Sequence, residues 1–410
     1  MSIKALVLLL AAWPLSATTY YVQPSGNNSS AGTSYGSAWA TLGKVLNSGS
    51  SVTSGDLVYL APGVYREVSI VVAISPASEV QIICDVTGTH TSGTPGECQL
   101  TAFLTNDSTL ASTLLMLNLN GKDFLTFQDL VFIGGGFGGS GAGMIVDAAT
   151  TPTSTNITLR RCVFVNQYTT TGNQINISTP VSAPLHWLID SCRFVSLNGN
   201  AAIGITFTSN NGSEHDLDIV VKNSTFLGDG PNSSAYIQLT TSGDWGGGGL
   251  IVYNCFFMGH KTAVAQTDFG STTYATKVYG SVILQGYDST ALKCNWCSHT
   301  GVPVMLEDYN IIVSPTPRAI SNGSWTNGTH TKTDGSIATL FYFGQERLWS
   351  TSSRPFGMPL SGAGWNAFNS QAGSPSIDIL GASRPSPGAA GAYEYALPVG
   401  AAQYSSSAAH

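Results

Sequence analysis

Charged side chains are scarce in this chain. Lys and Arg number 16 and Asp and Glu 23, together 10% of the 410 residues, where soluble proteins average about 25%. The net charge of -7 leaves no cationic cluster that could neutralise phosphates, which excludes a nucleic-acid partner. Beyond the amino terminus no apolar run approaches the ~20 residues of a membrane helix, so we expect no membrane span. A hydrophobic content of 42% excludes a disordered chain.

The amino terminus carries an export signal. Lys4 precedes an apolar run over residues 5–13, Pro14 breaks that run, and Ala17 offers a small residue for cleavage. This pattern is typical of a secretory signal peptide, so we expect residues 1–17 to be removed and the protein to be secreted. A buried first strand is the alternative. Abundant Ser, Thr, Asn and Gly likewise indicate a β-rich extracellular surface.

Seven cysteines fit an exported chain, because export permits disulfides. Cys84 and Cys98 bracket a turn-rich stretch that they could close as a disulfide. Cys294 and Cys297 form a CxxC without the second ligand pair of a zinc site and without the βαβ context of a redox motif. A short loop disulfide is therefore the favoured interpretation for this pair.

An internal repeat organises the middle of the chain. Seven segments each contain a short apolar strand, a bend and a second strand. The residues just after the bend, spaced by 32, 30, 32, 31, 26 and 29, are Leu130, Cys162, Cys192, Ser224, Cys255, Ser281 and Asn310. A period near 30 with several short strands predicts a parallel β-helix, in which coils stack at about 4.8 Å and bury the apolar face that one coil cannot bury alone.

Stacking makes specific predictions for individual columns. The residues after the bend should form an inward column, in which Cys162 and Cys192 are either a disulfide or two buried thiols. Two residues further on, Phe132, Phe164, Phe194, Phe226, Phe257, Ile283 and Ile312 should stack in the core. Left-handed backbone is expected at bend residues that tolerate it, such as Ser191, Asn223, Asn254 and Gly280.

The flanks complete the expected organisation. A short amphipathic helix over residues 41–46 should cap the open end of the core, since solenoid ends need protection. We expect an N-terminal cap over residues 18–60, the β-helix over 61–395 and a flexible tail over 396–410.

Three stretches carry a resemblance to a known group of proteins. They are residues 19–27 (TYYVQPSGN) with 38–42 (AWATL), residues 55–67 (GDLVYLAPGVYRE), and residues 373–378 (GSPSID) with 391–395 (GAYEY). Together with the repeat they resemble secreted proteins of the pectin-lyase-like fold. The resemblance implies an all-β, single-stranded, right-handed parallel β-helix. Its members include polysaccharide lyases, glycoside hydrolases, adhesins and virion proteins, so it does not decide function.

Motifs of the enzymes with this fold are missing or incomplete. No Asp-Asp pair occurs, and Gly259-His260-Lys261 matches only two residues of the Gly-His-Gly of polygalacturonases. The strands expected to line the outer face are nearly free of acids, with Tyr236, Gln238, Thr240 and Lys293 expected to point outward. Calcium prefers carboxylate oxygens, so we expect neither a metal nor another cofactor.

One constellation nevertheless suggests chemistry. Asp229, His260 with Lys261, and Asp288 follow successive repeats at similar positions, so stacking would align them along one turn. Two carboxyls separated by two coils, roughly 9 to 10 Å, approach the spacing of an inverting glycosidase, with His260 between them as a proton carrier. A solvated turn that uses Asp and Gly for its backbone is the alternative.

Further residues could bind a saccharide. Lys261, Tyr236, Trp245 and Trp296 are the candidates for substrate binding, because aromatic faces suit sugar C–H surfaces and also pack cores. A second cluster at residues 214–218 (EHDLD) could bind a cation or lie in an exposed loop.

Two functions remain open at the level of sequence. The favoured one is a non-catalytic extracellular or virion-surface module that binds a polysaccharide, a cell-surface glycan or a partner protein. The alternative is a polysaccharide-degrading enzyme, a hydrolase or lyase, that uses Asp229, His260 and Asp288. The resemblance also implies a homotrimer or a virion or surface assembly.

Overall fold

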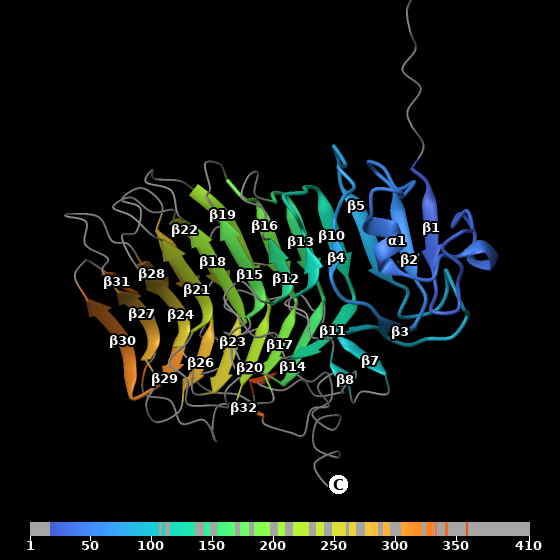
Figure 1. The fold of residues 1–410 in the computed structure, drawn as a ribbon. Coiled ribbons are helices and arrows are strands. Elements are labelled where there is room, and N and C mark those ends of the chain that lie inside the picture. The colour runs from blue at the N-terminus through green and yellow to red at the C-terminus, as the bar shows by residue number, and fades with distance from the viewer. Residues whose placement is uncertain are drawn as a thin grey trace, which may run out of the picture.

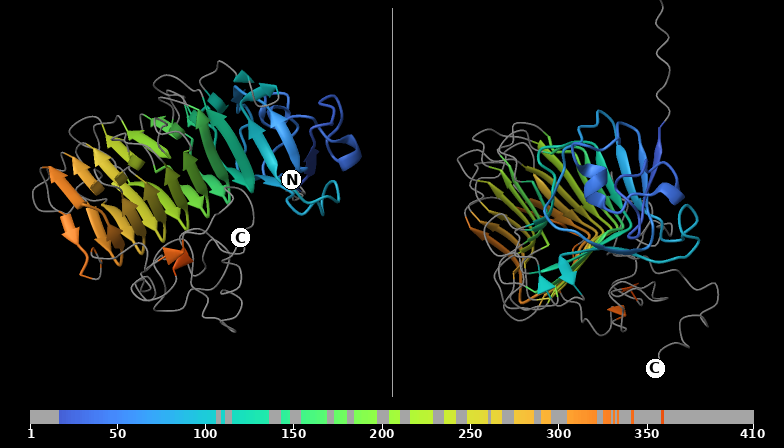
Figure 2. Two further views of the ribbon diagram at one scale, coloured as in Figure 1. Left: turned by 90° about the horizontal axis from the view of Figure 1, so that it is seen from below. Right: turned by 45° about the vertical axis from the view of Figure 1, so that its right-hand side comes forward.

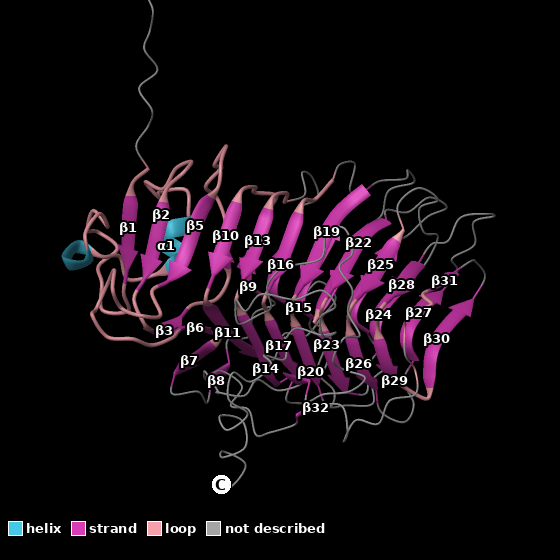
Figure 3. Ribbon diagram, turned by 180° about the vertical axis from the view of Figure 1, so that it is seen from behind, coloured by secondary structure: helices cyan, strands magenta, loops and turns pink. Residues whose placement is uncertain are grey.

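The structure is a computed structural model of the whole chain. It describes residues 17–105, 109–110, 115–135, 143–147, 154–168, 173–179, 184–196, 204–209, 216–228, 235–241, 248–259, 262–267, 275–285, 290–295, 305–321, 325–329, 331, 333, 341–342 and 358–359. Strands dominate these residues, and helix occurs only near the amino terminus (Figure 3).

Three parallel sheets of eleven, nine and nine strands, as far as the described residues extend, run along the molecule (Figure 1). Sheet A holds β1 (Thr19–Val22), β2 (Leu57–Leu60), β5 (Val80–Cys84), β10 (Leu125–Gln128), β13 (Ile157–Arg160), β16 (Trp187–Asp190), β19 (Asp216–Lys222), β22 (Gly248–Tyr253), β25 (Thr276–Tyr279), β28 (Met305–Asp308) and β31 (Trp325–Asn327). Sheet B holds β3 (Gly63–Arg66), β6 (Cys98–Thr101), β11 (Leu130–Gly135), β14 (Val163–Tyr168), β17 (Arg193–Ser196), β20 (Thr225–Gly228), β23 (Phe256–Gly259), β26 (Val282–Gln285) and β29 (Ile311–Val313). Sheet C holds β4 (Ile70–Val71), β9 (Leu115–Asn118), β12 (Gly143–Asp147), β15 (Asn173–Thr179), β18 (Ile205–Ser209), β21 (Ala235–Thr241), β24 (Thr262–Thr267), β27 (Thr290–Asn295) and β30 (Thr316–Ser321).

The chain visits the sheets in the order A, B, C and then returns to A one coil further along. Each strand pairs in parallel with the equivalent strands of the preceding and following coils, for example Phe132 with Phe164 and Phe164 with Phe194. The predicted all-β parallel β-helix is therefore confirmed, and the strand register reproduces the spacing that the repeat gave.

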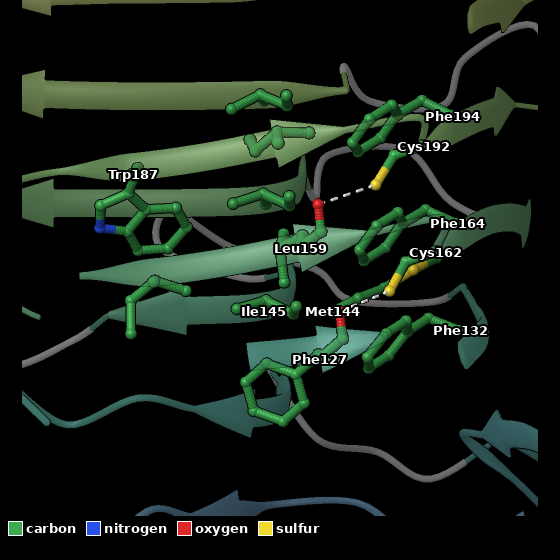
Figure 4. Close-up of a cluster of buried hydrophobic side chains, with 14 of the residues drawn as sticks. Phe127, Phe132, Met144, Ile145, Leu159, Cys162, Phe164, Trp187, Cys192 and Phe194 are labelled. Carbon is green, nitrogen blue, oxygen red and sulfur yellow. Dashed lines mark hydrogen bonds between the residues drawn. The ribbon is translucent and has the colours of Figure 1, made fainter. Parts of the chain in front are cut away.

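The inner face of sheet B carries the predicted aromatic stack (Figure 4). Phe132, Phe164 and Phe194 lie parallel with ring centroids 4.8 and 4.9 Å apart, and Phe226 and Phe257 continue the stack. These distances equal the spacing of hydrogen-bonded strands, about 4.8 Å, so register alone brings the rings into contact. The rings are buried and form one continuous core with the inner faces of sheets A and C.

The column after the bend is also buried, and its cysteines are free thiols. Cys162 and Cys192 donate from Sγ to the carbonyls of Phe127 and Leu159, at 3.3 and 3.4 Å (Figure 4). Burial raises the pKa of the Cys192 thiol, which disfavours the reactive thiolate. Of the two alternatives left open by the sequence, buried thiols describe this pair.

The corner between sheets A and B is made by one residue per coil in left-handed conformation. The predicted bend residues Ser191, Asn223, Asn254 and Gly280 all have positive φ, between 50° and 60°. Asp129 occupies the same corner with positive φ, as do Arg161 and Tyr309, although Arg and Tyr rarely adopt this conformation. The corner is therefore a property of the coil geometry, which overrides the preference of single residues.

The amino-terminal end of the core is closed by α1 (Leu42–Leu46), which lies beside β4. Leu42, Val45 and Leu46 are buried in the core, as expected for the predicted cap. Thr41 caps the helix by accepting from the Lys44 amide, and the Glu67 carboxylate accepts from the first amides of the helix, which have no partner within it.

Two further elements stabilise or end the coil. The predicted disulfide joins Cys84 at the end of β5 to Cys98 at the start of β6. Cys294 is also disulfide-bonded, and its expected partner Cys297 lies outside the described residues. At the other end of the molecule, Glu307 is buried and forms an ion pair with Arg318. These two residues lie at the inward positions that Val278 and Leu292 hold one coil earlier.

Candidate functional site

The predicted catalytic residues belong to the turns that lead from sheet B to sheet C. Asp229 follows β20, His260 and Lys261 lie between β23 and β24, and Asp288 follows β26. All four lie outside the described residues. The strands before them stack in register, with Gly228 beside Gly259 and Gly259 beside Gln285. The three turns therefore start at one corner in successive coils, while the alignment of the side chains stays a prediction.

Tyr236 does not point outward as the strand pattern suggested. Its side chain is 3% exposed and its hydroxyl donates to the carbonyls of Met258, at 2.7 Å, and Gly228, at 3.2 Å. The expectation fails because alternation begins only after the corner, where Tyr236 and Ile237 are both buried. Gln174 has the same place two coils earlier, and its Nε2 donates to the carbonyls of Phe164 and Val195. A role for Tyr236 in substrate binding stays a prediction, and the contacts described here are structural.

Gly259 is required by this corner. Its φ is 140°, and a Cβ would lie 2.0 Å from the Gly228 carbonyl oxygen and 2.2 Å from the Tyr236 hydroxyl. Packing at this corner therefore explains Gly259, one of the two residues that match the Gly-His-Gly motif.

The outer face of sheet C carries a column of mostly polar, mostly uncharged side chains. Strand register places them one above another, in the order Asn176, Thr206, Gln238, Ala265 and Lys293. Gln238, Thr240 and Lys293 are half-buried, as expected for the outward positions of a parallel sheet. Gln238 Nε2 donates to Thr240 Oγ1 at 3.0 Å. The outward side chains described on these strands include no acid, in agreement with the sequence.

One polar atom of this column is unpaired. Thr206 Oγ1, between Asn176 and Gln238, is buried and has no hydrogen-bond partner in the described structure. A buried hydroxyl without a partner is costly. Trp245 follows β21 and Trp296 follows β27, and both lie outside the described residues.

A histidine–aspartate pair at the corner between sheets C and A was not foreseen. His186 Nδ1 lies 2.5 Å from Asp218 Oδ2, both side chains are half exposed, and both residues have positive φ. The sequence had singled out the segment 214–218 but not its partner. The signal was available, since the separation of 32 residues is one period of the repeat. In the described part of the chain, no three His, Cys, Asp or Glu side chains gather closely enough to hold a metal ion.

The coil order and the left-handed corner between sheets A and B decide the fold. The chain is a parallel β-helix of three sheets. No protein-family model matches this β-helix, and no curated protein matches it in sequence.

Several solved structures are remotely similar to this chain. The pectate lyase Pel9A is 12% identical with a TM-score of 0.46, over 92% of this chain and 96% of that one. XylC in complex with xylose is 9% identical with a TM-score of 0.42, over 92% and 98%. A rhamnogalacturonan lyase is 11% identical with a TM-score of 0.41, over 83% and 96%. Likenesses this remote say nothing of the chemistry of the β-helix described here.

Proposed function

We propose that the protein is an extracellular module that binds glycans through the outer face of sheet C, without catalysing their cleavage. The observation that carries this proposal is the column of hydrogen-bonding side chains Asn176, Thr206 and Gln238 on three successive coils, which continues after Ala265 with Lys293. Amide and hydroxyl groups both donate and accept, which suits saccharide hydroxyls. Orientation in binding sites comes from a few well-placed polar groups of this kind.

The periodicity of the β-helix favours a polymer over a single sugar. Equivalent side chains recur about every 4.8 Å along the sheet, so one chain molecule could meet the same chemistry on several coils. The absence of acids from the described outer face means that an acidic polysaccharide would not be repelled there, and Lys293 would attract it. A neutral glycan is the better match, because a single lysine supplies little electrostatic affinity.

An enzyme that degrades polysaccharides is the second candidate. It is supported by the register of the strands that precede Asp229, His260 and Asp288, because these strands end at the same corner in three successive coils. The strand before Asp229 and the strand before Asp288 are two coils apart. Two coils correspond to roughly 9 to 10 Å, near the upper end of the ~6.5–9.5 Å that suits an inverting hydrolase. A lyase would act at the same turn. In this proposal Lys261, Trp245 and Trp296 hold the substrate.

Binding and cleavage can be separated in one experiment. The protein is titrated with a panel of neutral and acidic oligosaccharides by calorimetry, and the same mixtures are assayed for reducing ends and unsaturated products. The binding proposal expects weaker binding after Gln238→Ala and no products. The matched control is Gln81→Ala, a half-buried glutamine on the outer face of sheet A. Products that disappear after Asp229→Ala or Asp288→Ala would establish the enzyme instead.

A location outside the cell is part of the proposal. The disulfide between Cys84 and Cys98 supports it, because such bonds persist in oxidising compartments. The leader over residues 1–17 supports it as well, although residues 1–16 are not described. Among the described helices, none has the length and apolar character needed to cross a membrane. A homotrimer or a virion or surface assembly is tested by light scattering, and a monomeric mass would count against both.

A further inference from the structure

Amide and amine side chains on the outer face of sheet C follow a period of two coils. The strands of this sheet succeed one another along the molecule in chain order (Figure 2), and their register places one outward residue of each coil in a single column. From β9 to β30 the column reads Asn118, Val146, Asn176, Thr206, Gln238, Ala265, Lys293 and Ala319. An amide or an amine therefore alternates with a shorter side chain over eight successive coils.

The exposed fraction of these residues follows the same alternation. The four residues with an amide or an amine are half-buried, whereas Val146, Thr206 and Ala265 are 1%, 9% and 5% exposed. Ala319, in the last coil of the column, is half-buried as well. The groups of this column that a ligand reaches first are thus two coils apart, roughly 9 to 10 Å.

The longer side chains of the column have hydrogen-bonding capacity for a ligand. An amide offers two N–H donors and a carbonyl oxygen, and an ammonium group offers three donors. Gln238 uses one donor for Thr240 Oγ1, which lies in the next outward column of the sheet, and this leaves a second N–H and the carbonyl oxygen. A ligand that runs along the column therefore meets one such group on every second coil.

We infer that the ligand of this face is an extended (1→4)-β-linked polysaccharide that lies parallel to the axis of the β-helix, with one sugar on each coil. The inference rests on the proposed function, because it names the class of glycan that the same face binds.

The linkage follows from the period of the column. In a (1→4)-β-linked chain each sugar advances the chain by roughly the spacing of neighbouring strands, which is ~4.8 Å. Each sugar is also turned over relative to its neighbours, so that the same hydroxyl edge faces the protein only at every second sugar. The column offers an amide or an amine at that period and a shorter side chain under each sugar between. A (1→4)-α-linked chain of the same sugars winds into a helix and leaves a straight row after a few sugars.

A length series tests the period directly. The full-length protein is titrated by calorimetry with (1→4)-β-linked oligosaccharides of two to six sugars, made of glucose, xylose, mannose or N-acetylglucosamine. A third and a fifth sugar each reach a further amide or amine, so affinity in the recognised series should rise about fivefold at these two lengths, the equivalent of one hydrogen bond. A fourth and a sixth sugar should change it by less than about twofold.

The outcomes separate this inference from the binding function itself. An affinity that rises evenly with each sugar would overturn the inference and leave glycan binding in place. Tighter binding of (1→4)-α-linked gluco-oligosaccharides than of the β-linked isomers of equal length would do the same. Absence of binding to every oligosaccharide, including the acidic ones, would overturn both.

A substitution that removes the alternation provides a second test. Ala265→Gln places an amide on the coil between Gln238 and Lys293, where the inference places a sugar that needs room. Binding of the six-sugar chain should weaken about fivefold or more, the loss of at least one hydrogen bond. Thr158→Gln, at a half-buried outward position of sheet A, is the matched control and should bind as the parent does. Unchanged affinity in a folded Ala265→Gln variant would contradict one sugar per coil, and the length series decides if that variant does not fold.

Discussion

Sheets B and C are two sides of the same β-helix and have the same strand geometry, yet their outward side chains differ in chemistry. The outer face of sheet B presents Val282, Leu284 and Ile311 in buried positions, whereas that of sheet C presents Gln238 and Lys293, half open to solvent. Parallel strand stacking fixes where the outward residues of both sheets lie and does not fix which residues they are. The two outer faces therefore differ in their outward residues and not in their backbone.

The inner faces show the opposite behaviour. They are mostly apolar on all three sheets, because each coil depends on its neighbours to bury its core, and Glu307 is one of the few buried polar exceptions. A face that is polar in several successive coils is suited to a ligand with its own repeat. Each prediction below changes one residue on one side of this comparison.

The largest effect is expected from a charge on the outer face of sheet B. Val282→Asp places a carboxylate at a fully buried position without a partner, which should lower the free energy of unfolding by on the order of 3–5 kcal/mol. Gln238→Asp, on the outer face of sheet C, should change it by less than about 1 kcal/mol. Urea unfolding followed by circular dichroism measures both, and similar losses would erase the distinction between the faces.

The stability of the protein should be nearly as sensitive to substitution at the corner between sheets B and C. Gly259→Ala introduces a Cβ that meets the Gly228 carbonyl and the Tyr236 hydroxyl, at a φ that only glycine adopts easily. We expect a loss of about 2–3 kcal/mol. Gly55→Ala has positive φ but open space, so it should cost about 1 kcal/mol, and Gly36→Ala, with neither constraint, should be neutral. An order other than 259, 55, 36 in thermal unfolding would contradict this explanation.

Two neighbours in β21 should separate stability from binding. Tyr236→Phe removes the donor to the Met258 carbonyl, which should cost about 1 kcal/mol of stability and leave glycan affinity unchanged. Gln238→Ala should leave stability within about 0.5 kcal/mol and weaken binding about fivefold, the equivalent of one hydrogen bond. Calorimetric titration and urea unfolding of the same two variants give the four values. Loss of binding in Tyr236→Phe without loss of stability would place that hydroxyl in the binding site.

Much of the fold could be predicted from the sequence because a solenoid converts spacing into contact. The separations of 32, 30, 32, 31, 26 and 29 residues between repeats are the separations between paired strands, for example between Phe194 and Phe226. The buried column with Cys162 followed from the same spacing, whereas the disulfide of Cys84 and Cys98 was expected because the two residues bracket a turn-rich stretch. The left-handed bend at Arg161 did not, because a preference of one residue cannot reveal a corner that the neighbouring coils impose.

The candidate site was less accessible to sequence reasoning. Strict alternation placed Tyr236 outside, whereas the corner turns two consecutive residues inward. The pair of His186 and Asp218 lay one period apart and was missed, because only the apolar anchors were aligned. Asp229 and Asp288 lie in turns, whose paths depend on their own residues instead of the repeat. Spacing therefore predicts which turns share a corner and does not predict how their side chains meet.

The smallest expected effect concerns the single cation described on the outer face of sheet C. Lys293→Ala removes the charge at a half-buried position of the column, and we expect a neutral oligosaccharide to bind within about twofold of the parent, since one exposed charge contributes little. An acidic oligosaccharide should lose more, and only its affinity should fall as salt rises from low to physiological concentration. Titrations of both ligands at two salt concentrations provide the measurement. A strong salt dependence for the neutral ligand would mean that charges elsewhere hold it, and would move the binding site away from sheet C.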